Sequence, residues 1–167
     1  LSITYCPLPN HALLAACRET RTKRSGPGGQ HRNKTETAVV LTHLPTGTTA
    51  EASERRSQAE NRRMALWRLR LRLAIEHRMP PSPVGPSPLW EARSRGGRIT
   101  VSPEHDDYPS LLAEALDQLA AAQGDAAAAA SQLGVTATQL VRLFKKQTAA
   151  WTALAACRRA HGLPPLH

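Results

Sequence analysis

A proline-rich stretch in the middle of the chain limits what this sequence can fold into more than any other feature. Residues 79–88 read Met-Pro-Pro-Ser-Pro-Val-Gly-Pro-Ser-Pro and include five prolines. Because proline lacks a backbone donor and has a fixed φ, such a run cannot continue a helix and favours an extended linker. The 167-residue chain has room for one ordinary domain or two small ones. We therefore predict a first domain over 1–79, a Pro/Gly-rich linker with a short hairpin over 80–108, and a helical unit over 109–167.

The first part alternates strand-like segments with turn signals. β-branched and apolar residues at 16–23 and 37–44 indicate two strands, and the proline and glycine within residues 45–47 indicate a turn. Residues 48–52 can then return as the second arm of a hairpin. These segments predict a small β-sheet.

A helix is predicted to follow these strands, from residue 57 to residue 77. Ser57 and Glu60 have the spacing of a capping box, which begins helices. Residues 67–73 alternate arginine with apolar residues, and this period of two is a strand pattern. The cap, the length of the segment and its Ala, Leu, Arg and Glu content favour the helix. The first part is thus expected to have an α+β fold, with its small sheet packed on helices.

The part beyond the linker is predicted to be all-helical. Gly96 and Gly97 lie between short apolar pieces within residues 89–102, which suggests a small hairpin ahead of the helices. Apolar periodicity then indicates helices over 111–122, 125–133, 138–146 and 148–160.

The charge of the chain favours a polyanionic partner. The formal net charge is +9 and the pI is about 10.5. Residues 1–80 carry 14 Lys and Arg against 6 Asp and Glu, whereas residues 81–167 carry 8 against 7. Contacts with nucleic acid are therefore expected mainly in the first half. Aromatic residues make up only 4% of the chain, which argues against a single-strand binder built on stacking.

Several classes of protein are excluded by what the sequence lacks. No apolar run approaches the ~20 residues that a membrane span needs, and residues 1–10 do not resemble a secretory signal. Cys6, Cys17 and Cys157 are far apart and have no C-x-x-C spacing, which argues against a disulfide framework or a zinc site. We expect a soluble cytoplasmic monomer without a metal or other cofactor.

A glycine-rich segment with basic neighbours is the strongest chemical signal. Residues 24–34 read Arg-Ser-Gly-Pro-Gly-Gly-Gln-His-Arg-Asn-Lys. Glycines allow positive φ and close approach of the backbone to a ligand. A phosphate-binding loop of the Walker type is rejected, because Asn33 replaces a required glycine and a strand follows where that loop needs a helix. For Gly-Gly-Gln alone, an exposed turn would be the better interpretation.

The residues around this tripeptide favour another interpretation. Over about residues 15–78, the sequence closely resembles the catalytic domain of class I peptide-chain release factors, and most of all the short relatives that rescue stalled ribosomes. The matching elements occur in order at 24–30, 33–34, 39–41, 43–47, 56–58 and 61–62. The resemblance implies a small sheet packed on helices, from which the Gly-Gly-Gln (GGQ) loop projects.

The resemblance also implies an activity, which is hydrolysis of the ester that joins a nascent peptide to tRNA. Gly28, Gly29 and Gln30 would be the catalytic residues. Side chains at the two glycines would obstruct entry into the peptidyl-transferase centre. The backbone N–H of Gln30 can donate to a developing oxyanion, and its uncharged amide can position water without acting as a base. No metal or other cofactor is required.

Contacts to RNA are expected from residues on and beside the loop. The expected partners are ribosomal RNA and peptidyl-tRNA, and an ordinary solvated surface charge is the plainer alternative for the arginines outside the loop. The candidate RNA-binding residues are Arg24, Ser25, Arg32, Asn33, Lys34, Arg55, Arg56 and Arg62.

A chain of this length has no room for the domains with which full release factors read stop codons. We therefore expect release without codon reading, as in ribosome rescue; the alternative is a non-catalytic adaptor that binds the ribosome or tRNA. Residues 112–146 are similar to a Fis-type helix-turn-helix, although a generic three-helix bundle remains an alternative. If this segment binds nucleic acid, the expected contacts are Arg142, Lys145 and Lys146. A DNA-binding regulator is a third hypothesis.

Overall fold

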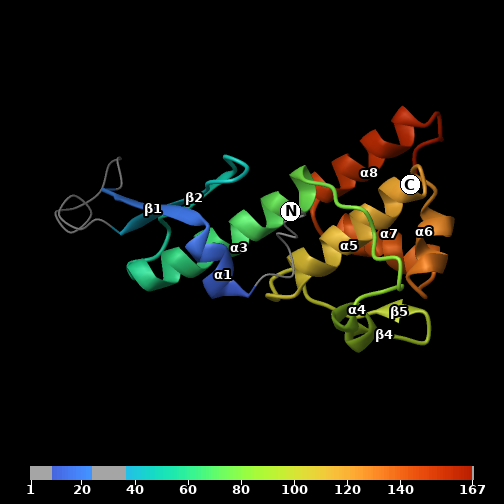
Figure 1. Ribbon diagram of the computed structural model, residues 1–167, viewed down its shortest axis with the longest axis horizontal. Coiled ribbons are helices and arrows are strands. Elements are labelled where there is room, and N and C mark those ends of the chain that lie inside the picture. Colours follow the sequence, from blue (N-terminus) through green and yellow to red (C-terminus); the bar gives the residue numbers. More distant parts are fainter. Residues whose placement is uncertain (1–8, 24–36, 167) are drawn as a thin grey trace. The chain divides into compact units, whose positions relative to one another are not determined.

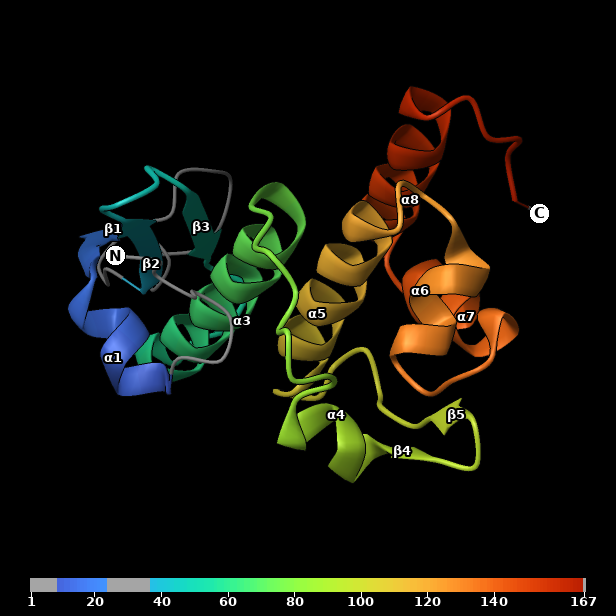
Figure 2. The same cartoon turned by 45° about the vertical axis from the view of Figure 1, so that its right-hand side comes forward.

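The computed structural model describes residues 9–23 and 37–166. The chain divides into two compact units, a first that ends at Leu73 and a second that begins at Ala74. Figures 1 and 2 together label the helices and strands of both units. The predicted α+β class is confirmed, since a small antiparallel sheet and helices are both present.

The first unit contains a three-stranded antiparallel sheet in the order β1-β2-β3. Cys17 pairs with His43 and Thr22 with Ala38, and in the next pair Val39 lies opposite Ala52. These strands confirm the sheet that the sequence predicts. The elements are α1 (Asn10–Ala15), β1 (Cys17–Thr22), β2 (Ala38–His43), β3 (Thr49–Ala52) and α3 (Gln58–Glu76).

Helices α1 and α3 cover one face of this sheet, as Figures 1 and 2 both show. Leu13 of α1 and Leu69 of α3 are fully buried against Val39 and Leu41 of the central strand β2. The buried α3 residues Ala65, Leu66, Leu69 and Leu73 follow helical spacing, which places them on the side of α3 that faces the sheet. The core of the first unit is therefore aliphatic.

The arginines of α3 explain why its sequence alternates like a strand. Arg68 Nη1 donates to the Glu51 carbonyl at 2.7 Å, and Arg72 Nη1 donates to the Thr49 carbonyl at 2.6 Å. Both acceptors lie on the edge strand β3, whose outer backbone groups would otherwise need water. Arg70, on another side of the helix, donates from Nε to Asn10 Oδ1 at 3.0 Å. The predicted helix is confirmed, and its arginines face two different neighbours.

The second unit contains the helices that the sequence predicts together with one that it does not. Residues 88–93, predicted within a hairpin region, form a helix instead. Ser87 Oγ accepts the Trp90 N–H at 3.1 Å, and Pro88 lies at the start of the helix, where its missing N–H has no cost. The elements are α4 (Pro88–Arg93), β4 (Ser94–Arg95), β5 (Arg98–Ile99), α5 (Tyr108–Ala121), α6 (Ala126–Gln132), α7 (Ala137–Lys145) and α8 (Thr148–Ala160).

Buried aromatic side chains join the helices of the second unit. Trp90 of α4 is fully buried and its Nε1 donates to the Leu133 carbonyl at 2.8 Å. Tyr108 is also fully buried and its hydroxyl donates to the Leu143 carbonyl at 3.0 Å, while burial raises its pKa to about 12. Both rings therefore add buried apolar area and satisfy a backbone acceptor. Figure 2 shows α5 and α8 beside the shorter α6 and α7.

Within the described ranges, every helix is too short or too polar to cross a bilayer.

Candidate functional site

The candidate site of the first unit lies where β1 and β2 are joined. Thr22, the last residue of β1, pairs with Ala38, the first residue of β2, so the segment between them leaves and re-enters the sheet at the same end. The predicted catalytic residues Gly28, Gly29 and Gln30 lie within that segment and outside the described residues. The same is true of the predicted RNA contacts Arg24, Ser25, Arg32, Asn33 and Lys34.

A buried amide lies at the base of this connection. Asn61, in the first turn of α3, is fully buried. Its Oδ1 accepts the Arg55 N–H at 2.9 Å, and its Nδ2 donates to the Arg55 carbonyl at 3.0 Å and to the Thr37 carbonyl at 2.7 Å. Asn61 therefore joins three segments, which are the start of α3, the stretch before it, and the residue that directly precedes β2.

Buried polar groups are costly unless they are hydrogen-bonded, so this side chain fixes its neighbours firmly. Loss of the amide would leave backbone groups of Arg55 and Thr37 without these partners, at a cost of about 1–3 kcal/mol for each group that stays buried. From the sequence alone, Asn61 belongs to the family resemblance and has no predicted role. Its signal is an asparagine inside a helix, where this residue is unfavourable unless its side chain has partners.

The helix start itself follows the predicted capping box in part. Ser57 Oγ accepts the Glu60 N–H at 3.4 Å, and the Ser57 carbonyl accepts the Asn61 N–H at 3.1 Å. This geometry begins α3 directly after the basic pair Arg55 and Arg56 and turns Asn61 toward the protein interior.

The predicted RNA contacts that the structure describes fall into two groups. Arg55 and Arg56 are exposed, and no carboxylate among the described residues pairs with either of them. Arg62 instead forms an ion pair with Glu19 of β1, with 2.7 Å between Nε and Oε2, and its side chain is 45% exposed. Arg62 therefore joins α3 to β1 and still leaves part of its guanidinium open to solvent.

Glu19 lies between two arginines. Its carboxylate also accepts from Arg21 Nε at 3.2 Å. The hydrogen bond from Arg62 lowers the pKa of Glu19 below its ordinary value, and Arg21 lowers it further. The carboxylate therefore stays ionised to a lower pH than an isolated glutamate would, and its charge reduces the positive field on this side of the sheet.

The described part of the chain contains no cluster of three or more His, Cys, Asp or Glu side chains that would hold a metal ion. Asp107 pairs with Arg93 at 2.6 Å between Oδ2 and Nη2. Cys17 and Cys157 are both free thiols, and burial raises the pKa of Cys17.

Comparison with known proteins locates the first unit in a family. Residues 15–82 match the model of the RF-1 domain. The similar relatives include peptide chain release factor 1-like, mitochondrial, from Mus musculus, at 53% identity over 57 residues, which is 34% of this chain and 15% of the relative. Peptide chain release factor 2 from Variovorax paradoxus is 49% identical over 65 residues, 39% of this chain and 17% of the relative.

A third relative agrees with these two. Peptide chain release factor 1 from Acidiphilium cryptum is 57% identical over 51 residues, 30% of this chain and 14% of the relative. The chain thus spans about one sixth of the length of these curated relatives. The sheet, α3 and the segment with the Gly-Gly-Gln tripeptide all lie inside the matched range. Over residues 15–82, the chain therefore carries a domain of the class I peptide-chain release-factor family.

Proposed function

We propose that this protein hydrolyses the ester bond of peptidyl-tRNA in the peptidyl-transferase centre of the ribosome, without reading a codon, and that it acts in ribosome rescue. The observation that carries the proposal is the family match over residues 15–82, which includes the Gly28-Gly29-Gln30 tripeptide between two antiparallel strands. The relatives are named as peptide chain release factors.

The chemistry follows from the residue types in the tripeptide. A water molecule attacks the ester carbonyl, the bond between that carbon and the ribose oxygen breaks, and a proton from the water ends on the ribose oxygen. Negative charge develops on the carbonyl oxygen and on the leaving ribose oxygen before that proton arrives. The backbone N–H of Gln30 donates to that charge, while its amide side chain holds the water in line for attack. Because an amide does not titrate near neutral pH, Gln30 contributes position and dipole and takes no proton.

The described residues support this chemistry by holding the ends of the loop. The sheet pairs Thr22 with Ala38, and Asn61 binds the Thr37 carbonyl. A connection with both ends held on a sheet can reach a distant site while its own base stays in place. Arg55 and Arg56 add positive charge directly before α3, where RNA phosphates can be bound.

The residues after the matched range are the reason for proposing release without codon reading. The family match ends at residue 82, and residues 108–160 form four helices of a separate unit. The proposal therefore has the first unit perform hydrolysis and does not assign codon recognition to either unit.

A peptide-release assay tests the proposal. Ribosomes carrying labelled peptidyl-tRNA are prepared with a stop codon, with a sense codon, or with mRNA truncated at the P site. The wild type should release peptide from the truncated complexes. Gln30→Ala should lower the rate about 100-fold or more, because the water is no longer positioned. Gln132→Ala, which removes an exposed glutamine of α6, is the matched control.

Two outcomes would count against this function. If the wild type releases no peptide from any of the three complexes while it still binds ribosomes, the protein is the non-catalytic adaptor instead. If only the stop-codon complexes respond, hydrolysis stands and release without codon reading is wrong.

A further inference from the structure

The cations of the second unit fall into two groups. One group is bound inside the unit, as when Arg158 donates to the Gly124 carbonyl at 2.7 Å and to the Pro164 carbonyl. Arg78 pairs with Asp117, Arg93 with Asp107, and Lys146 donates to the Val101 carbonyl. The second group is exposed and, within the part of the chain that the structure describes, has no carboxylate partner. It consists of Arg95, Arg98, Arg142, Lys145 and Arg159. The first four lie on the β4–β5 hairpin and on α7, and we call them the basic face, whereas Arg159 lies on α8.

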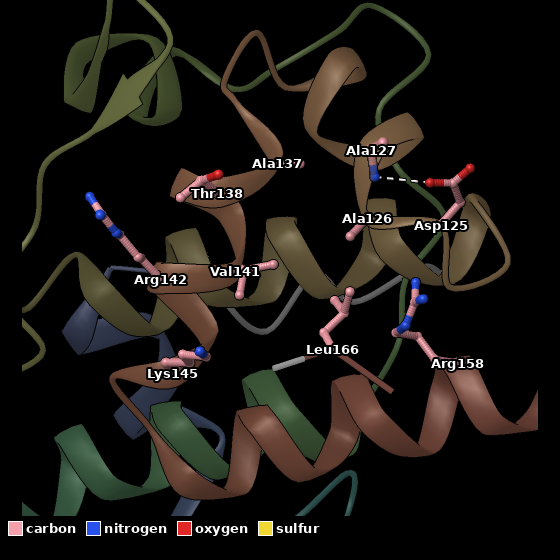
Figure 3. Close-up of a pocket in the computed structure, with 10 residues that line it drawn as sticks. All are labelled: Asp125, Ala126, Ala127, Ala137, Thr138, Val141, Arg142, Lys145, Arg158 and Leu166. Atoms are coloured by element: carbon pink, nitrogen blue, oxygen red, sulfur yellow. Dashed lines mark hydrogen bonds between the residues drawn. The ribbon is translucent and has the colours of Figure 1, made fainter. Parts of the chain in front are cut away.

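Two members of the basic face lie on α7, the second helix of a helix-turn-helix. Gly134, with φ of +64°, makes the turn after α6, and Thr136 caps α7 by accepting the Gln139 N–H at 3.3 Å. Leu140, Leu143 and Phe144 bury one side of α7. Figure 3 shows Thr138, Val141, Arg142 and Lys145 spaced along its other side.

The other two members come from the β4–β5 hairpin, which is bound to the same turn. The Thr136 N–H donates to the Gly97 carbonyl at 2.9 Å, at the first turn of α7. Arg95 and Arg98 pair directly across the hairpin, so their side chains share one face. Ile99 is buried, and strand alternation therefore turns its neighbour Arg98 outward. The hydrogen bond between Thr136 and Gly97 thus joins the turn of the hairpin to the N-terminus of α7.

The groove beside α7 is consistent with an anionic partner. It has a volume of about 500 Å³, and Asp125 is the one carboxylate among its described lining residues. The Asp125 carboxylate caps α6, because its Oδ1 accepts the N–H groups of Ala127 and Ala128. Lys145 Nζ lies 5.1 Å from the centroid of the Trp151 ring, which holds the ammonium at the surface without neutralising it.

We propose that the second unit binds double-helical RNA through the basic face, by contacts with phosphates and without reading sequence. The face is cationic, and the aromatic ring described beside it, that of Trp151, has Lys145 Nζ over the ring face on which a single-stranded base would stack. The major groove of an A-form helix is too deep and narrow for α7, so contacts go to the backbone. The choice of RNA over DNA rests on the proposed function, which places the first unit among ribosomal RNA.

Binding of a labelled 20-base-pair RNA duplex to the full-length chain, followed by fluorescence anisotropy over a range of salt concentrations, tests this inference. The fourfold variant Arg95→Ala, Arg98→Ala, Arg142→Ala and Lys145→Ala should bind at least tenfold more weakly than the wild type. The slope of log affinity against log salt should become shallower by about 3, because each lost phosphate contact contributes somewhat less than one unit. Circular dichroism confirms that the variant is folded.

A matched pair of single variants controls for net charge. Arg142→Ala and Arg159→Ala each remove one exposed arginine from the second unit. If the position of an arginine, and not the net charge of the chain, determines affinity for the duplex, then only Arg142→Ala should weaken binding, by about threefold. Equal affinity of the wild type and the fourfold variant would overturn the proposal. The proposal would also be overturned if the wild type bound a DNA duplex of the same sequence more tightly than the RNA duplex and the fourfold variant lost that DNA binding.

The partner class is tested on ribosomes with a photo-reactive residue in place of Thr138. Cross-links to RNA are expected, and cross-links to ribosomal protein alone would overturn the inference. The readout is independent of catalysis, because Gln30→Ala should lose peptide release and keep duplex binding. The proposed function and this inference can therefore fail separately.

Discussion

In the first unit, the side chains that bind backbone carbonyls are amides and guanidiniums. In the second unit, two buried aromatic rings do so as well, beside cations such as Arg158. Asn61, Arg68 and Arg72 hold the strands and the base of the loop. Trp90 and Tyr108 hold α4, α6 and α7 in the same way. Among the residues that the structure describes, the buried core cluster of the first unit consists of Leu, Val and Ala.

This difference separates two ways of positioning a functional segment. A polar group fixes a direction but adds little apolar area, so its removal should disturb local geometry more than global stability. A buried ring contributes both a hydrogen bond and a large apolar surface, so its removal should weaken the whole unit. The four predictions below test this contrast, from the largest expected effect to the smallest.

The largest effect is expected at Trp90. Trp90→Ala should destabilise the second unit by about 3–5 kcal/mol, because it removes a fully buried ring and leaves a cavity. Hydrogen exchange of α4, α6 and α7, followed by mass spectrometry, measures this loss. Trp90→Phe keeps most of the apolar area and loses the bond to the Leu133 carbonyl, so it should cost only about 1–3 kcal/mol. Equal costs for the two variants would show that the hydrogen bond, and not the ring, stabilises the unit.

Asn61 is expected to behave differently. Asn61→Ala should destabilise the first unit by about 2–4 kcal/mol, because it leaves buried backbone groups without partners. At a temperature where the variant is folded, its peptide-release rate at saturating concentration should fall more than its affinity for ribosomes. Asn61→Asp keeps the acceptor for the Arg55 N–H but places a buried carboxylate oxygen against two carbonyl oxygens, so it should destabilise the unit at least as much as Asn61→Ala. The control is Arg63→Ala, an exposed change on the same helix. A loss of stability with an unchanged release rate would limit Asn61 to a structural role.

Because of Asp117, we expect the unfolding free energy of the second unit to fall as pH rises. Burial raises its pKa from 3.8 to about 6, although Asp117 Oδ1 accepts from the Met79 N–H at 2.9 Å and pairs with Arg78. Because the folded pKa is the higher one, the contribution of Asp117 is fully present below about pH 4 and is lost as pH rises through 6. The unfolding free energy of the wild type minus that of Asp117→Asn should fall by about 3 kcal/mol from pH 4 to 7. A difference that is constant over this range would contradict the prediction.

The pair of Glu19 and Arg62 should have the smallest effect and the opposite pH dependence. Arg62→Ala should cost at most about 1 kcal/mol, because the pair is partly exposed to solvent. The pKa of Glu19 is lowered in the fold, so the contribution of the pair is present above the ordinary glutamate pKa and is lost as pH falls through the lowered value. Urea denaturation at pH 7 and at pH 3 measures both. A variant that loses as much stability at pH 3 as at pH 7 would exclude the carboxylate as the cause.

Local sequence was enough to predict many elements because their determinants are close together in the chain. The spacing of Ser57 and Glu60 predicted the start of α3. Residues 67–73 form part of this helix, as their residue content predicted, although they alternate like a strand. The helix at 88–93 is not predicted, because Pro88 ends the proline run that indicates a linker and the residues after it were expected to form a hairpin. A proline at the first position of a helix costs nothing, and Ser87 provides the cap.

By itself, the sequence determined the α+β class, the approximate limits of the strands and helices, and the release-factor family of residues 15–82. Periodicity, caps and an ordered motif are properties of neighbouring residues. Only the tertiary structure decided that Asn61 joins α3 to Thr37, that Arg62 pairs with Glu19, and that the hairpin with Arg95 lies against the start of α7. These pairs are tens of residues apart in the chain, and hydrogen bonds between such distant residues form only when packing of the core has brought their elements together.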